Sequence, residues 1–168
     1  GAFPEDHRYA MHMLGMHGTR YANYAMHHCD CIIAVGARFD DRVTGKLEEF
    51  APEREEIVHI DIDPASISKS IPVTVPAVGD CGTILKKLAK ILEPAKRPEW
   101  IARCMEWKEQ NPLSYKNDDG RLRPQMVIEE LYKLTQGNAI VATEVGQHQM
   151  WTAHFWQFTR PRSFLSSG

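Results

Sequence analysis

A run of five apolar residues, CIIAV at 31–35, limits the possible folds more than any other stretch of the chain. It contains no polar residue, and Gly36 ends it after five positions. A run this short and this uniformly apolar is typical of a strand buried on both faces, which occurs mainly in parallel sheets covered by helices. It therefore favours an α/β fold with a parallel sheet.

Further strands and helices follow in the order that such a sheet requires. A second strand is predicted at 56–62, and a third at 72–78, whose two prolines indicate an edge strand or a short one. The glycine-rich stretch at 15–20 predicts a turn into a helix that Thr19 can cap, and Gly79-Asp80 lead into another helix. We predict a parallel α/β sheet of the dinucleotide-binding, Rossmann-like kind.

The composition changes after about residue 94, which indicates a domain boundary. A helix is predicted around Trp100–Trp107, followed by a polar, turn-rich stretch at 111–121. Pro124 suits the first turn of a new helix, and a strand is predicted at 139–142. The predicted divisions are a central dinucleotide-binding domain at 1–95, a linker with a helix at 96–122, and the start of a second α/β domain at 123–168.

Composition and charge narrow the range of partners. The chain has 168 residues, 43% of them hydrophobic, and a formal net charge of -2, so nothing indicates a nucleic-acid or membrane-surface partner. No apolar run approaches the roughly 20 residues of a membrane span, and there is no signal-peptide pattern. The first and last residues, GAFPEDH and LSSG, suggest a segment of a longer protein. Four cysteines are predicted to be reduced, mostly buried thiols in a cytosol-like compartment: Cys29, Cys31, Cys81 and Cys104.

Three polar corners follow the predicted elements where open α/β sheets bind ligands. At 17–19 the start of a helix offers free amides and a partial positive charge to a phosphate. At 36–42 a glycine admits a ligand, and two arginines can clamp pyrophosphate or stack on a flat ring. At 61–63, with Gly79-Asp80 further on, an acidic residue can accept hydrogen bonds from ribose hydroxyls. Together the three corners suit an adenine dinucleotide.

Each of these stretches also has a simpler interpretation. The charged residues at 38–42 could form a surface ion-pair cluster of little energetic value, and Asp63-Pro64 could be only a turn. The polar string at 147–149 could be a solvated loop at the end of a strand. The sequence does not predict a metal site, because the candidate histidines lack a matching carboxylate at ligand spacing. These histidines are His7, His12, His27 and His28.

Several strings of the sequence resemble the large catalytic subunit of acetolactate synthase (acetohydroxyacid synthase), and the similarity runs from end to end. The order GARFDDRVTG followed by GQHQMW is highly specific, whereas pyruvate oxidases share the architecture but match these strings less well. Glu144 departs from the pattern, which has Asp or Gly there. The matching strings are LGMHGT at 14–19, VGARFDDRVTGKLEEFA at 35–51, VHIDIDPASISK at 58–69, GD at 79–80 and VGQHQMW at 145–151.

The resemblance implies part of a central FAD-binding domain and the start of a thiamine-diphosphate-binding domain. The implied FAD contacts are His17, Gly18, Thr19, Gly36, Ala37, Arg38, Asp40, Arg42, Asp61, Ile62, Gly79 and Asp80. The implied thiamine diphosphate contacts are Val145, Gly146, Gln147 and His148. The implied lining of the substrate channel is Met16, Asp41 and Arg42. No metal ligand falls on this chain, because the magnesium motif of the family is expected after Gly168.

The resemblance also implies an activity. The family decarboxylates pyruvate and joins the two-carbon unit to a second 2-oxo acid in branched-chain amino-acid biosynthesis, with thiamine diphosphate, FAD and Mg²⁺ as cofactors; the flavin is mainly structural. The activating glutamate belongs to an earlier domain, so no catalytic set is complete here, and we expect the 168-residue chain alone to be inactive. The implied full-length protein is a homo-oligomer, dimer or tetramer, with a regulatory small subunit, in the cytoplasm or an organellar stroma.

Two alternatives to this hypothesis remain open. The first is a related thiamine-diphosphate flavoenzyme such as pyruvate oxidase, in which the flavin is a redox partner. The second is a non-catalytic module that binds FAD or NAD and works through partners. A preference for FAD over NAD would separate the enzyme hypothesis from the second alternative.

Overall fold

The computed structural model describes residues 2–166, which divide into two compact units. The sheet unit is Asn23–Met105, and the terminal unit combines the residues up to Ala22 with those from Glu106 on. Helices α1 (Arg20–His27) and α4 (Pro98–Gln110) run across this division. The predicted domain bounds at 95 and 123 describe a different division of the chain and stay a prediction.

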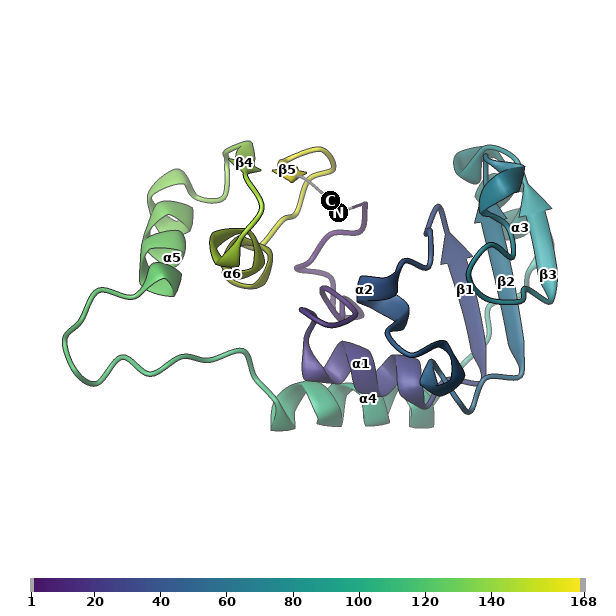
Figure 1. Cartoon of the computed structure of the whole chain (residues 1–168), viewed down its shortest axis with the longest axis horizontal. Helices are drawn as coiled ribbons and strands as arrows, with labels where there is room; N and C mark the ends of the chain where they lie inside the picture. The colour runs from purple at the N-terminus through teal and green to yellow at the C-terminus, as the bar shows by residue number, and fades with distance from the viewer. Residues whose placement is uncertain (1, 167–168) are drawn as a thin grey trace. The chain divides into compact units, whose positions relative to one another are not determined.

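Three parallel strands form the sheet of the sheet unit (Figure 1). They are β1 (Cys31–Val35), β2 (Glu56–Asp61) and β3 (Val75–Val78), in the spatial order β1-β2-β3. The predicted parallel α/β fold is confirmed. The third strand is shorter than predicted, since its pairing with β2 begins at Val75, and it tolerates Pro76 because it lies at an edge of the described sheet.

The core of the sheet unit lies against one face of the sheet. Ile32 and Ala34 of β1 pack there with Ile57 of β2 and with residues of the following loops. Ile33 and Val35 point to the opposite face and are 60% and 41% exposed. The prediction that β1 is buried on both faces is therefore wrong for this chain, because the clustered core residues lie on one side of this strand only.

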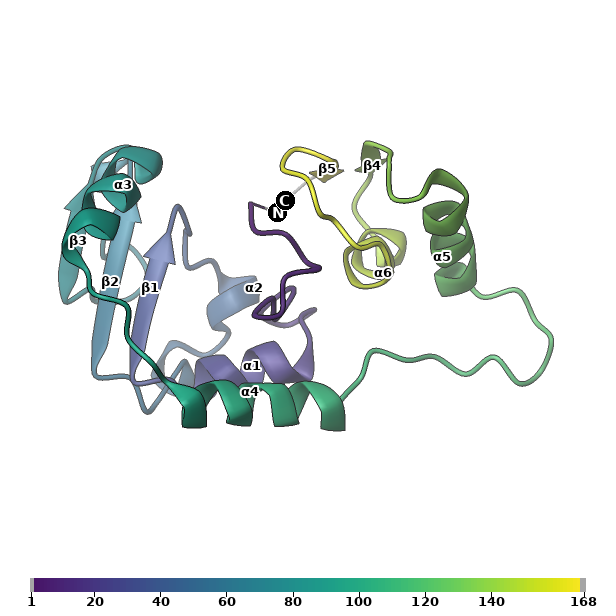
Figure 2. The ribbon, with the colours of Figure 1, turned by 180° about the vertical axis from the view of Figure 1, so that it is seen from behind.

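Short helices connect the strands of the sheet unit. α2 (Asp41–Thr44) and the 3-10 helix η1 (Leu47–Glu49) lie between β1 and β2, and η2 (Pro64–Ser66) follows β2. α3 (Cys81–Ile91) packs against β2, and both views show it beside the strands (Figures 1 and 2). This helix follows Gly79-Asp80, as predicted.

The terminal unit contains a separate, two-stranded parallel sheet. α5 (Pro124–Thr135) is followed by β4 (Val141–Thr143), α6 (Gln147–Phe155) and β5 (Phe164–Ser166). β4 pairs with β5, and α6 forms the crossover that a parallel pair needs. Pro124 occupies the first turn of its helix, as predicted. The strand β5 was not predicted.

Aromatic side chains hold the terminal unit together. The rings of Phe158 and Phe164 stack with centroids 4.6 Å apart, and Trp156 stacks on Phe158 at 6.1 Å. Tyr132 of α5 meets Trp156 edge-on, which fixes α5 beside the end of α6. These contacts bury Trp156 and Phe158 almost completely.

Several apolar or thiol side chains are more exposed than the sequence indicated. Leu131 and Leu134 of the apolar stripe on α5 are exposed in this chain. All four cysteines are free thiols, but only Cys104 is buried, so the prediction of mostly buried thiols is wrong. Among the described residues, none of the helices has the length and apolar character that crossing a membrane would require.

Candidate cofactor-binding site

The carboxyl ends of the three strands are tied together by backbone hydrogen bonds. The amide of Gly36 donates to the carbonyl of Ile60 at 2.8 Å, and the amide of Gly79 donates to the carbonyl of Asp61 at 2.8 Å. Gly36 has a φ of 62°, a conformation that favours glycine, and a Cβ there would lie 3.8 Å from the sulfur of Cys81. The second and third predicted corners therefore meet at one edge of the sheet.

Phe39 anchors the charged loop that follows Gly36, and sequence reasoning did not single it out. Its ring is 7% exposed and meets the His59 ring edge-on at 5.1 Å. Because this side chain turns inward, its neighbour Arg38 remains exposed at the edge of the sheet. Asp41 and Arg42 are also exposed there. A single bulky aromatic inside a charged string was the available signal for this anchor.

Two of the predicted ligand-binding aspartates serve as helix caps. Oδ1 of Asp40 accepts hydrogen bonds from the amides of Arg42 and Val43 at 3.0 and 3.2 Å, which caps α2. Oδ1 of Asp80 accepts from the amide and the hydroxyl of Thr83 at 2.7 and 2.8 Å, which caps α3. These hydrogen bonds from Thr83 hold the pKa of the Asp80 carboxyl below its usual range. Both carboxylates thus have a structural role, whatever else they contact.

Asp61, at the same edge of the sheet, caps no helix. It is 8% exposed, and its Oδ1 accepts a hydrogen bond from the amide of Asp63 at 2.9 Å. Its Oδ2 lies 3.8 Å from Nε2 of His59, a side chain with no exposed surface. Ile62, the next residue, is exposed beside it. The His59 contact was not predicted, because a histidine inside an apolar strand pattern gives no signal of its partner.

The turn at 15–19 belongs to the terminal unit, and its amides are largely used within the turn. The amide of Gly18 donates to the carbonyl of Gly15, and that of Thr19 donates to the carbonyl of Met13, both at 2.9 Å. The prediction of free amide donors is therefore wrong for these two groups. The predicted cap is confirmed, since the Thr19 hydroxyl accepts from the amide of Ala22 at 3.2 Å.

Gly18 cannot be replaced without moving the backbone. A Cβ at this position would lie 2.4 Å from the carbonyl oxygen of Met13 and 2.5 Å from the carbonyl carbon of Leu14. The exposed side chains of Met16 and His17 stand at the surface of this tightly folded turn. The turn therefore fixes the positions of both side chains.

The predicted thiamine diphosphate residues form the start of a helix. Glu144 to Gly146 make a turn after β4, and α6 begins at Gln147, so Gln147 and His148 lie in a first helical turn instead of a loop. Gly146 precedes it with φ 152° and ψ -173°, a conformation open almost only to glycine. Within residues 2–166 no side chain caps this start, and its first turn contains no acidic residue to offset its partial positive charge.

A histidine later in α6 joins this helix to the turn at 15–19. Nε2 of His154 lies 2.7 Å from the carbonyl oxygen of His17, to which it donates when that nitrogen carries the proton. Burial lowers the pKa of His154, which favours the neutral ring. The helix that begins at the predicted thiamine diphosphate corner is therefore joined by a hydrogen bond to the turn at 15–19.

A hollow of about 770 Å³ lies elsewhere in the sheet unit. It is lined by residues at the amino end of β1, among them Cys31, and by the start of α4, among them Arg97 and Trp100. The strand ends that carry Gly36 and Gly79 are not part of its lining. We place the candidate dinucleotide site at the carboxyl edge, where the polar groups converge, and not in this hollow.

Residues 1–88 match the family of the thiamine pyrophosphate enzyme, central domain. The chain belongs to this family. Both the sheet edge at Gly36 and the turn at 15–19 lie within the matched residues. The expected contacts at 145–148 lie beyond the match.

Comparison with curated relatives extends the similarity over the whole chain. The large subunit of acetolactate synthase isozyme 3 from Escherichia coli is 44% identical, covering 100% of this chain and 30% of that protein. The chloroplastic acetolactate synthase of Arabidopsis thaliana is 48% identical, covering 100% of this chain and 26% of that protein. A probable acetolactate synthase large subunit from Methanocaldococcus jannaschii is 45% identical. The chain spans about 30% of the length of the curated relatives it matches.

Proposed function

We propose that this chain is a segment of an acetolactate synthase large subunit, which condenses pyruvate with a second 2-oxo acid after decarboxylation. The observation that carries the proposal is the convergence of Gly36, Asp61 and Gly79 at one sheet edge, in a chain that aligns over its full length with acetolactate synthase large subunits. A glycine in a left-handed conformation beside an acidic side chain suits the close approach of a dinucleotide. We expect that this segment alone does not form the 2-hydroxy-2-methyl-3-oxo acid product of this condensation.

The dinucleotide proposed for this edge is FAD. Arg38 is exposed where its guanidinium can pair with a pyrophosphate, and the Asp61 carboxylate can accept hydrogen bonds from ribose hydroxyls. Ala37 and Ile62 would contribute small and apolar surface at the same edge. Asp40, Arg42 and Asp80 belong to the same set, with the two aspartates also holding the helix starts.

The start of α6 is proposed as one wall of the thiamine diphosphate site. An uncapped helix start with a preceding glycine favours the negative charge of a diphosphate. When bound, thiamine diphosphate supplies the electron sink for the reaction. Val145 to His148 of this chain would bind and orient the diphosphate, and the ligands of Mg²⁺ and the activating glutamate would come from other segments.

Met16, Asp41 and Arg42 are proposed to line the path of the 2-oxo acid substrates. All three side chains are exposed, so each is accessible to a small molecule. A guanidinium at this position would attract the carboxylate of a 2-oxo acid. The whole protein is further proposed to be a homo-oligomer with a regulatory small subunit, in the cytoplasm or a plastid-like stroma.

The proposal is tested by flavin binding to the purified chain. We expect FAD to bind in preference to NAD, measured by fluorescence quenching of the flavin and by calorimetry. Arg38→Gln and Asp61→Asn should each weaken FAD binding by about tenfold, as expected for the loss of a charge-assisted hydrogen bond. Arg97→Gln, at the opposite edge of the sheet, is the control and should leave the affinity unchanged.

Equal binding of FAD and NAD would contradict the flavin assignment. In a protein that carries this segment together with the remaining domains, acetolactate formation from pyruvate would then be measured with the same two variants. Unchanged flavin content and unchanged activity in both would overturn the proposed site.

A further inference from the structure

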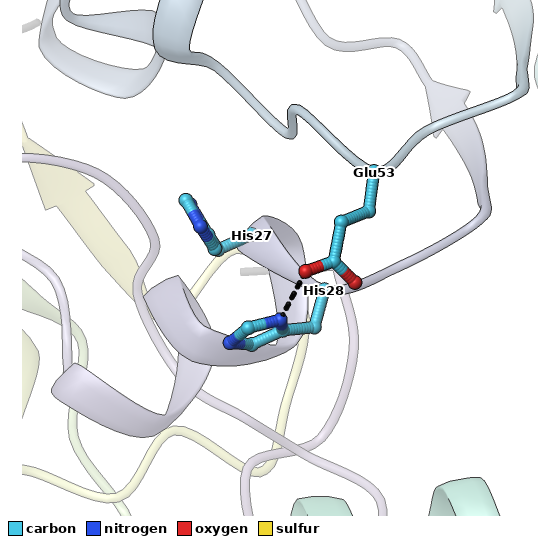
Figure 3. A group of neighbouring side chains, drawn as sticks. All are labelled: His27, His28 and Glu53. Atoms are coloured by element: carbon cyan, nitrogen blue, oxygen red, sulfur yellow. Dashed lines mark hydrogen bonds and ion pairs between the residues drawn. The ribbon is translucent and has the colours of Figure 1, made fainter.

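Two histidines at the end of α1 meet a carboxylate from a different part of the chain. His27 is the last residue of α1 and His28 follows it, while Glu53 lies in the loop before β2 (Figure 3). Nδ1 of His28 lies 2.7 Å from Oε1 of Glu53. No carboxylate lies at ligand spacing from these histidines along the sequence, but the fold brings one from 25 residues away.

We propose that His27, His28 and Glu53 form a binding site for zinc(II), or for another divalent cation that prefers imidazole and carboxylate ligands. Nothing in the proposed thiamine enzyme function requires this site. It lies at the amino ends of β1 and β2, whereas the candidate cofactor site lies at their carboxyl ends. Two imidazoles and one carboxylate are a ligand set that zinc uses when a further position stays open to water.

The spacing of the three donor atoms is close to what one ion requires. One ligand atom from each residue lies within 4.8 Å of the others. Tetrahedral zinc, with bonds of about 2.0–2.1 Å to nitrogen and oxygen, needs ligand atoms roughly 3.4 Å apart. The His28–Glu53 pair is already closer than this, and the His27 ring, 4.9 Å from the His28 ring between centroids, has to rotate inward. His27 and Glu53 are exposed, so such a rotation meets little packing resistance.

The backbone under the cluster is fixed by hydrogen bonds. The carbonyl of Asp30 accepts from the amides of Glu55 and Glu56 at 2.7 and 3.2 Å, which joins the segment after His28 to the segment after Glu53. The amide of His28 donates to the carbonyl of Tyr24 at 3.1 Å, which continues the helix to the ligand. The ligands thus stand on segments whose separation is set before any ion binds, as an effective site requires.

A second set of contacts fixes the loop that carries Glu53. The guanidinium of Arg54 donates to the carbonyl of Ala51 at 2.9 Å and also to the carbonyl of Phe50. These bonds turn the positive charge of Arg54 toward the backbone of its own loop. Phe50 and Ala51 belong to the buried core, so the loop is anchored just before Glu53.

Other charged side chains and one thiol lie near the three proposed ligands. Asp30, Glu55 and Glu56 are exposed carboxylates on the same two segments and favour a cation. Burial raises the pKa of the Cys29 thiol, which donates to the carbonyl of Met26 at 3.1 Å and is therefore a poor metal ligand. Opposing charge comes from the cationic residues that line the hollow beside His28, which are Lys96, Arg97 and Arg103.

A bound ion would connect the end of α1 to the loop before β2. Without an ion, Nδ1 of His28 and Oε1 of Glu53 form a contact open to solvent, which contributes little to stability. A cation that binds the folded chain and not the unfolded chain raises stability in proportion to its affinity and concentration. The site therefore makes the stability of the sheet unit depend on the concentration of zinc.

The experiment is a titration of the purified chain with Zn²⁺, followed by competition with a chromophoric chelator, and a parallel titration with Co²⁺ followed by its visible absorption. We expect one site, with a Co²⁺ spectrum of low coordination number. Each of the three ligand variants should weaken Zn²⁺ binding by at least about tenfold: His27→Asn, His28→Asn and Glu53→Gln. Removing a residue that only hydrogen-bonds to a metal ligand already costs about that much. The matched controls are Glu48→Gln, an exposed carboxylate outside the cluster, and His7→Asn, an exposed histidine elsewhere.

Thermal unfolding of each variant is also measured with and without Zn²⁺. Because the stability gained from Zn²⁺ is compared within each variant, a variant that is itself less stable can still be tested. The parent chain and both controls should gain stability from Zn²⁺, and the three ligand variants should lose that gain whatever their own stability. Zn²⁺ affinity within twofold of the parent in all three ligand variants would overturn the site. Loss of binding in Glu48→Gln or His7→Asn as large as in Glu53→Gln would also overturn it, because the binding would then be unspecific.

Discussion

The helices at the two candidate cofactor corners begin in different ways. In the sheet unit, α2 and α3 start behind Asp40 and Asp80, whose carboxylates accept hydrogen bonds from the first amides of the helix. In the terminal unit, α6 starts behind Gly146, and no side chain caps it among the described residues. A capped start has satisfied its own donors, whereas an uncapped one leaves them to a ligand. A glycine followed by polar residues therefore precedes a capped helix start in the sheet unit and an uncapped one in the terminal unit.

The largest expected effect comes from the glycine before the uncapped helix. Gly146→Ala places a Cβ 3.1 Å from the His148 ring and forces alanine into a backbone conformation that only glycine adopts readily. We expect the terminal unit to lose about 2–3 kcal/mol of unfolding free energy. Chemical denaturation followed by tryptophan fluorescence measures the loss.

The matched control for this substitution is a glycine in the first turn of a capped helix. Gly82→Ala in α3 meets only Asp80 Oδ1, at 3.4 Å, and its φ is not in the left-handed range. Alanine is the better helix former by about 1 kcal/mol, so this variant should be neutral or more stable. Equal losses in the two variants would remove the distinction between the two helix starts.

A smaller effect is expected from removing a cap. Asp40→Ala deprives the amides of Arg42 and Val43 of their acceptor and should cost about 1 kcal/mol. Asp41→Ala changes the neighbouring exposed carboxylate, which is not the cap, and should cost clearly less. Urea unfolding of both variants compares them directly, and a larger loss in Asp41→Ala would contradict the assignment of the cap.

The smallest effect on stability is also the most informative about ligands. Gln147→Glu adds a negative charge to the first turn of α6 and should stabilise the helix by about 0.5 kcal/mol through its dipole. In a thiamine-diphosphate-binding protein that carries this segment, the same charge should weaken binding of the diphosphate by repulsion. Thermal unfolding measures the expected gain in stability, and calorimetry measures the expected loss of thiamine diphosphate affinity. Tighter binding in the variant would exclude this helix start as a phosphate site.

Much of the sheet unit could be predicted from local patterns. The apolar run at 31–35 predicted a strand of the right length, and Gly79-Asp80 predicted the start of α3, because cap and strand signals are both contained in a few adjacent residues. In the terminal unit, the cap at Thr19 and the first-turn position of Pro124 were predicted for the same reason. These features need no knowledge of the rest of the fold.

The features that sequence reasoning missed depend on distant parts of the chain. The strand β5 has three residues and exists through pairing with β4, more than 20 positions earlier. The helix α6 was hidden because its start is a polar string that also suits a loop. Glu53 reaches His28 only because β1 and β2 pair side by side, and no spacing within the sequence encodes that contact.

The hydrogen bond from His154 to the carbonyl of His17 has a thermodynamic consequence. A ligand that displaces α6 must stretch or relax this link, and with it the turn that presents Met16 and His17. Linkage free energies are reciprocal. A ligand at the helix changes the free energy of binding at the turn by the same amount as a ligand at the turn changes the free energy of binding at the helix. If the proposed ligands bind at the helix start and at the turn, this imidazole makes the two binding events interdependent, although 137 residues separate His154 from His17 along the chain.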